Sequence, residues 1–120
     1  DTPENKTFVA AYKAKFGQNR VTDDPIEAAY VGVHIWAKAV EKAGSTDVEK
    51  VRAAAKGIEF AAPEGKVTVD GDNQHIYKTV RMGRVRADGL IDEISATPKP
   101  VKPDPYLEGK DYPWAKSLKP

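Results

Sequence analysis

The segment 23–44 constrains the fold most, because it combines a well-marked helix start with apolar residues on nearly every face. Asp24 stands at an N-cap position, Pro25 follows at the first helical position, and Glu27 completes a D-x-x-E capping box. Gly44 supplies the C-terminal stop. Two apolar series follow at helical spacing: Ile26, Ala29, Tyr30, Val33, Trp36, Ala37 and Val40, and then Ala28, Val31, Ile35 and Ala39. We expect such a helix to be buried on more than one side.

Capping residues predict two further helices. The first begins at Thr2, ahead of a proline and an acid, and runs to Phe16 with an apolar seam of Phe8, Tyr12 and Phe16. The other begins at the S/T-x-x-E capping box that opens at Thr46 and ends at Gly57. The helical part of the sequence stops there.

From Lys66 onward the apolar period is two, which predicts a small antiparallel hairpin system. A brief extended piece and a turn over 58–65 lead into a strand around Val67 and Val69. A longer strand is predicted over 76–86, and a D-G turn then leads into a return strand that ends near Ile94.

Prolines dominate the rest of the chain, which therefore forms an extended strap or a loose end. They are Pro98, Pro100, Pro103, Pro105, Pro113 and Pro120. Tyr106, Tyr112 and Trp114 favour a strap that packs on something. We divide the chain into a helical and β-hairpin part, 1–94, and a proline-rich strap, 95–120.

Composition narrows the function classes. With 120 residues the chain is long enough for one domain, and a net charge of +1 gives no global field for nucleic acid or anionic membranes. The absence of cysteine excludes disulfides and thiolate chemistry. His34 and His75 lie on different elements without partner spacing, so we expect no catalytic residues.

No set of metal ligands can be assembled, and no cofactor motif is found. Asp70, Asp72 and Asn73 resemble the opening of a calcium loop, but the later glycine and glutamate are absent at their proper spacing. We therefore expect neither a metal nor a cofactor.

The run 77–86 offers an alternative function. Its basic residues and Tyr77 suit a small nucleic-acid-binding module. Alternation places Lys78, Arg84 and Arg86 on one face and Arg81 on the other. The acids across the predicted hairpin favour a solvated strand with cross-strand ion pairs, so we expect no nucleic acid.

The most informative chemical cluster is acidic. Asp23, Asp24 and Glu27 place three acids in five positions at the start of the central helix, whereas one cap needs one acceptor. A carboxylate there is stabilised by the helix dipole and can also accept N–H groups of a ligand. Capping alone remains the simpler interpretation of this pattern taken by itself.

Four stretches carry a resemblance to a known family: PENKTFVAAYKAKFG, VTDDPIEAAYVGVHIWAKAVEKAGSTDVEKVRAAAKG, AAPEGKVTVDGDNQHIYKTVRMGRVRADG and PVKPDPYLEGKDYPWAKSL. The most specific parts are TDDPIEAAY and APEGKVTVDGDNQHIYKT. Together they resemble the C-terminal portion of the urea-binding proteins of bacterial ABC transporters. These belong to the type I periplasmic binding proteins for amides and branched-chain amino acids.

The resemblance implies an α+β fragment of an α/β periplasmic-binding-protein type I fold, without enzymatic turnover. It implies that Asp23, Asp24 and Pro25 contact the ligand and that Glu27 and Tyr30 support them. The implied ligand is urea or a short amide, captured in the periplasm or at the cell surface and delivered to a membrane permease. Other contacts would come from a missing N-terminal portion of the same protein. A purely structural or partner-binding role, and self-association of the isolated chain, stay open.

Overall fold

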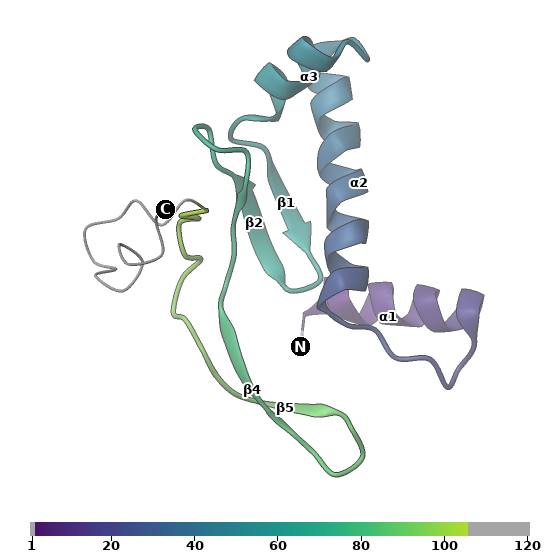
Figure 1. The fold of residues 1–120 in the computed structure, drawn as a ribbon. Helices are drawn as coiled ribbons and strands as arrows, with labels where there is room; N and C mark the ends of the chain where they lie inside the picture. The colour runs from purple at the N-terminus through teal and green to yellow at the C-terminus, as the bar shows by residue number, and fades with distance from the viewer. Residues whose placement is uncertain (1, 106–120) are drawn as a thin grey trace, which may run out of the picture.

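A computed structural model describes residues 2–105. In it, one long helix lies along a small antiparallel sheet, and a second hairpin extends beyond the sheet (Figure 1). The described elements are α1 (Pro3–Phe16), α2 (Asp24–Ala43), α3 (Val48–Ala55), β1 (Glu59–Ala62), β2 (Gly65–Val69), β3 (Ile76–Tyr77), β4 (Arg81–Val85) and β5 (Ile91–Ala96). The predicted order of helices followed by antiparallel strands, an α+β arrangement, is confirmed.

The start of α1 lies where the sequence places it. The Thr2 hydroxyl accepts a hydrogen bond from the Asn5 backbone N–H at 3.0 Å, and Pro3 occupies the first helical position. The same hydroxyl donates to the Pro63 carbonyl at 2.7 Å, which ties α1 to the turn between β1 and β2. Of the predicted seam only Phe8 is buried, whereas Phe16 is 54% exposed.

The predicted caps of α2 and α3 are each wrong by one residue. Asp23, not Asp24, caps α2, because its Oδ1 accepts the Ile26 N–H at 2.9 Å. Asp47, not Thr46, caps α3, because its Oδ1 accepts the Lys50 N–H at 3.1 Å. Aspartate is a strong N-cap, and in both places it stands next to the residue that the capping-box pattern selects. The side chain of Asp24 is therefore free of the capping role.

The core lies between one face of α2 and the three-stranded sheet. Val31 packs with Ala62 and Val67, and Ala39 packs with Ile58 and Val69. Ile35 and Ile76 contact both groups. The second apolar series of α2 thus faces the sheet, since residues 31, 35 and 39 are four positions apart.

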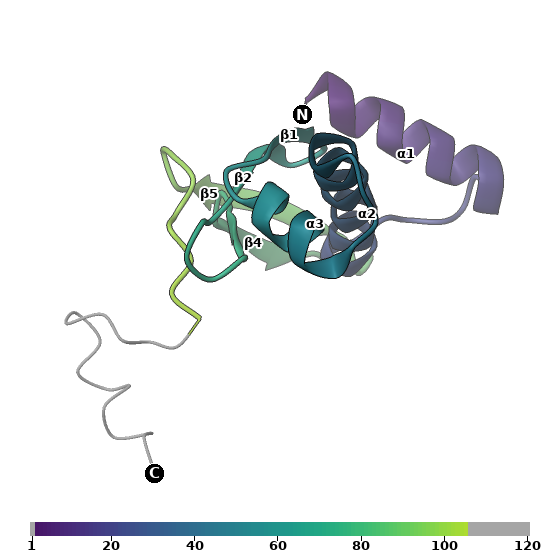
Figure 2. The same ribbon diagram turned by 90° about the horizontal axis from the view of Figure 1, so that it is seen from above.

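The other apolar face of α2 is open in the described chain. Val33 is 65% exposed and Trp36 is 56% exposed, so the expected burial of this helix on more than one side is not observed. Figure 2, which looks down on α2, shows α3 and the sheet on one side of the helix and α1 running outward on another. Periodicity could not select between two apolar faces.

The sheet has the order β1-β2-β3, and β1 pairs with β2 through the turn at 63–64. The predicted strand over 76–86 is divided. Its first two residues form β3 and pair with β2, whereas β4 leaves the sheet and pairs with β5 alone. Residues 79 and 80, between them, are not in a regular strand.

The β4–β5 hairpin contains a bulge at Met82 and Gly83, where the pairing register shifts. A Cβ at Gly83 would lie 2.3 Å from the Ile91 Cγ2, so a larger residue at this strand position would require the exposed Ile91 side chain to move. Every residue of β4 and β5 is exposed. Beyond β5, the Val101 backbone N–H donates to the Lys78 carbonyl at 2.8 Å, so the described part of the strap runs back beside the link to β4.

The predicted division of the chain at residue 94 stays a prediction, and β5 continues to Ala96. The aromatic residues expected to anchor the strap, Tyr106, Tyr112 and Trp114, lie outside the described residues.

Candidate functional site

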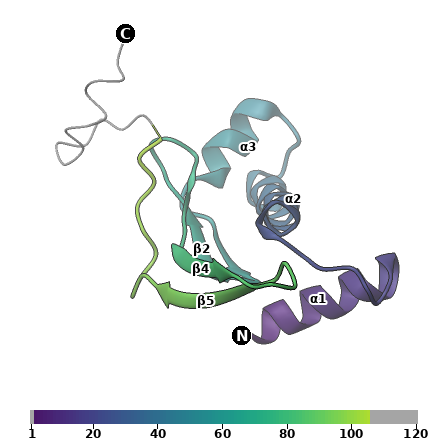
Figure 3. The same cartoon turned by 60° about the horizontal axis from the view of Figure 1, so that its bottom comes forward.

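A hollow of about 850 Å³ lies where the N-terminal ends of α1 and α2 meet the β1–β2 turn and the second hairpin. Figure 3, which brings this end of the molecule forward, shows α1 on one side and β4 and β5 on the other. Phe8 contributes an apolar wall from α1. The charged residues that line the hollow are Asp23, Asp24, Glu27, Glu64, Lys78, Arg81 and Glu93.

Lys78 lies at the centre of this charge cluster. Its Nζ is 2.6 Å from Asp24 Oδ1, 3.4 Å from Glu64 Oε1 and 4.0 Å from Glu27 Oε2. Burial acts to lower the pKa of Lys78, but the hydrogen bond to Asp24 and the charge of Glu64 raise it above its ordinary value. The ammonium group therefore joins α2, the β1–β2 turn and the link to β4.

Two of the acids around Lys78 are largely removed from solvent. The side chains of Glu27 and Glu64 are 11% and 12% exposed. Burial raises the pKa of both carboxyls, and the charge of Glu64 raises the pKa of Glu27 further. Lys78 opposes these shifts without cancelling them. The pair thus favours the binding of protons more than free glutamate does.

These shifts predict how stability depends on pH. In the folded chain Glu27 and Glu64 keep their protons at pH values above 4.5, the ordinary pKa. Between pH 4.5 and the raised pKa values, the unfolded chain therefore binds fewer protons than the folded chain. The free energy of unfolding is expected to fall as the pH rises from 4.5 through the raised pKa values. Thermal unfolding across this range should show a flatter slope in a Glu27→Gln/Glu64→Gln double variant. Glu59→Gln, at an exposed carboxylate, is the control, and an unchanged slope in the double variant would contradict the assignment.

The structure brings together three of the five residues predicted to bind ligand. Asp23, Asp24 and Glu27 line the hollow. Pro25 is exposed and is not among the lining residues. Tyr30 lies outside the lining too, in an aromatic group where its ring centroid is 4.9 Å from that of Phe8. This contact with Phe8 shows that the Tyr30 ring faces α1.

Four charged residues of the hollow were missed in the sequence: Glu64, Lys78, Arg81 and Glu93. Glu64 follows Pro63 in the turn between β1 and β2, and Lys78 and Arg81 were treated as strand residues on opposite faces. That assignment is wrong, because the irregular link at 79–80 removes the strand alternation and both side chains reach the hollow. The turn of Pro63, Glu64 and Gly65 could have pointed to Glu64, since it places an acid at the end of a hairpin.

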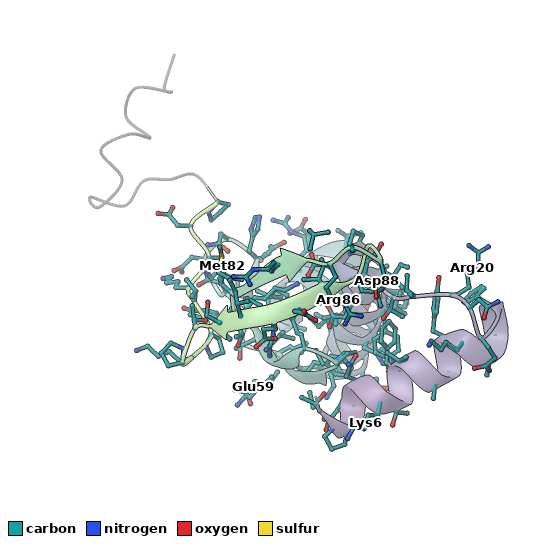
Figure 4. All side chains as sticks on the ribbon, turned by 90° about the horizontal axis from the view of Figure 1, so that it is seen from below. Lys6, Arg20, Glu59, Met82, Arg86 and Asp88 are labelled. Carbon is teal, nitrogen blue, oxygen red and sulfur yellow. The ribbon has the colours of Figure 1, made fainter. Side chains whose placement is uncertain are left out.

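The arginines of the second hairpin form cross-strand ion pairs, as predicted for a solvated strand. Arg81 Nη1 is 2.7 Å from Glu93 Oε2, and Arg86 Nη1 is 3.3 Å from Asp92 Oδ1. Figure 4 shows Arg86 beside Asp88, and their charged atoms are 2.6 Å apart. Carboxylates therefore engage two of the three arginines on which the nucleic-acid alternative depends.

The two histidines and the Asp70 loop have structural partners. His34 stacks on Phe60 with centroids 5.0 Å apart, and His75 Nδ1 lies 3.0 Å from the Asn73 carbonyl. Asp70 Oδ1 accepts the backbone N–H groups of Asp72 and Asn73, which lowers the pKa of Asp70. This loop is a hydrogen-bonded turn.

Within residues 2–105 no cluster of three or more metal-binding side chains occurs. None of the helices in this range has the length and apolar character to cross a membrane.

Comparison with known proteins gives the family to which this fold belongs. Residues 1–111 match the family described as "Periplasmic binding protein domain". The chain belongs to this family.

Of three relatives, two carry names of binding proteins and one carries the name of an enzyme. A solute-binding protein of an ABC transporter from Rhodopseudomonas palustris HaA2, solved in complex with p-hydroxybenzoic acid, is 33% identical, with a TM-score of 0.69 over 90% of this chain and 30% of that one. The Leu/Ile/Val-binding protein homolog 6 of Brucella abortus is 33% identical over 86 residues, 71% of this chain and 22% of its own length. A Geobacillus stearothermophilus protein named limonene hydroxylase is 29% identical over 107 residues, 89% of this chain and 20% of its own length. The chain therefore spans between a fifth and a third of these relatives.

Proposed function

We propose that this chain is the C-terminal part of an exported solute-binding protein that captures urea or a short amide and delivers it to the permease of an ABC transporter. It carries out no chemical turnover in this role. Family membership and the solute-binding relatives support the class of function. The finer choice of ligand depends on the acids of the hollow.

One observation carries the choice of ligand: three carboxylates from two elements converge on a single ammonium group. Urea presents four N–H donors and one carbonyl acceptor, so a surface rich in carboxylate oxygens suits it. The helix dipole at the start of α2 favours the negative charge of Asp23 and Asp24. The proposal therefore assigns Asp24 and Glu64 to the N–H groups of the ligand and makes Glu27 a further polar contact of the ligand.

The open apolar face of α2 supports the proposal that this chain is part of a larger protein. Val33 and Trp36 are more than half exposed on one side of a 20-residue helix. Exposed apolar residues grouped in this way mark a surface that another element covers. The hollow is larger than urea needs, so further protein would have to close it.

Calorimetric titration with urea tests this function on the full-length gene product that contains the 120 residues. Asp24→Ala is expected to weaken binding roughly tenfold or more, because a charge-assisted hydrogen bond contributes about 1.5–3 kcal/mol. Asp72→Ala is the matched control, since that side chain is 84% exposed and is not among the lining residues of the hollow.

Unchanged affinity in Asp24→Ala, combined with a loss of thermal stability, would reduce Asp24 to a structural partner of Lys78. The isolated chain serves as a second comparison and is expected to show no measurable affinity. A tight, saturable isotherm for it would show that the hollow needs no further protein.

A further inference from the structure

Glu27 Oε1 and Glu64 Oε1 are buried and have no hydrogen bond among residues 2–105. Glu64 Oε1 still lies 3.4 Å from Lys78 Nζ, so its negative charge has a nearby cation. Glu27 as a whole is only 8% exposed and still lines the hollow. A buried carboxyl oxygen without a partner is unfavourable, so Glu27 Oε1 calls for a group that the described chain does not supply.

The acidic groups around the carboxyls of Glu27 and Glu64 are not matched by an equal number of basic groups. Asp24 faces these two carboxyls from α2, and Lys78 faces them from the link to β4. Arg81 donates from β4 to the Glu64 carbonyl at 2.9 Å, but its guanidinium is also paired with Glu93 at 2.7 Å. One ammonium group thus serves the three carboxylates Asp24, Glu27 and Glu64. A second ionised carboxylate beside Glu64 is therefore disfavoured in this partly buried position.

Glu27 and Glu64 lie at different distances from the Lys78 ammonium group. Its Nζ is 3.4 Å from Glu64 but 4.0 Å from Glu27. The nearer cation stabilises the negative charge on Glu64 more than on Glu27. When the pair holds one proton, that proton therefore belongs on Glu27.

We propose that Glu27 binds the solute in its protonated form beside an ionised Glu64, so that the pair donates one hydrogen bond to the carbonyl oxygen and accepts one from an N–H group of the same urea or primary amide. This inference rests on the proposed function and adds a basis for selectivity to it. A carboxylic acid next to a carboxylate has one donor and one acceptor, which matches the edge of an amide. Guanidinium has the planar shape of urea but only donors, so the O–H donor of a protonated Glu27 opposes its binding, whereas an ionised Glu27 favours it.

The test is a calorimetric titration of the full-length gene product with urea and, separately, with guanidinium chloride at the same ionic strength, from about pH 4 to about pH 9 in steps of about one unit. Urea affinity is expected to fall roughly tenfold or more as Glu27 ionises, and guanidinium affinity is expected to rise over the same range. Glu27→Ala should lose urea binding at every pH. Glu27→Gln, whose amide is also a donor, should recover part of this loss without the pH dependence.

The outcomes separate the two proposals. Urea binding that is independent of pH in the parent protein, or equally weak binding by Glu27→Gln and Glu27→Ala, would overturn the shared-proton inference and leave urea capture standing. Absence of urea binding at every pH would overturn the proposed function itself. If Glu27→Ala does not fold, the comparison of the parent with Glu27→Gln still decides, because only the parent should respond to pH.

Discussion

Replacing Lys78 with methionine is expected to lower the free energy of unfolding by roughly 1.5–3 kcal/mol. Methionine keeps the apolar stem of the side chain but removes the only ammonium group within 4.0 Å of Asp24, Glu27 and Glu64 among the described residues. Two of these carboxylates are nearly buried, so they would be left without a counter-charge. The Lys78 side chain is 30% exposed, so we expect a smaller effect than for a fully buried ion pair.

Thermal and denaturant unfolding of Lys78→Met measures this loss, and Lys66→Met is the matched control. Lys66 Nζ is 2.7 Å from Glu59 Oε1, but both side chains are more than half exposed. An exposed pair of this kind contributes about 0–1 kcal/mol. Equal losses in the two variants would mean that the Lys78 cluster is an ordinary surface network. A further Glu64→Gln change in the Lys78→Met background should restore part of the stability, because it removes one of the unpaired charges.

The sequence predicts the local elements of this fold well because their signals are local. Pro3 and Pro25 start helices, Gly44 ends one in a left-handed conformation with φ of 60°, and the turn before Gly65 closes a hairpin. Each of these signals depends on backbone groups within four residues of itself. The helices and the first hairpin were predictable for that reason.

The side chains that face one another across the hollow were not predictable in the same way. Lys78 and Asp24 are 54 positions apart, and their contact depends on where β4 leaves the sheet. The irregular link at 79–80 interrupts the alternation of side chains in the predicted strand over 76–86, so that alternation does not tell which face Lys78 and Arg81 occupy. For α2, both apolar series fit a helix, and only the position of the sheet selects Val31 and Ala39 over Val33 and Trp36. The acids Asp23, Asp24 and Glu27 were found because they lie within one helical turn of each other.

Replacing Phe8 with alanine is expected to lower the free energy of unfolding by about 3 kcal/mol, the lower end of the range for a buried aromatic residue. Phe8 is 8% exposed and its ring is 4.9 Å from that of Tyr30, whereas the other aromatic residues of α1 are less buried. Besides this contact, the Thr2 hydrogen bond to the Pro63 carbonyl holds the start of α1. The helix should therefore loosen before the rest of the fold does.

Hydrogen exchange in α1, together with thermal unfolding, tests this expectation against Phe16→Ala. Phe16 has the same side chain on the same helix but is 54% exposed, so its loss should change stability by less than about 1 kcal/mol. Similar effects of the two substitutions would show that α1 is not held through Phe8. Phe8 is also a wall of the hollow, so a loosened α1 should weaken urea binding in the full-length protein even though no charged group has been removed.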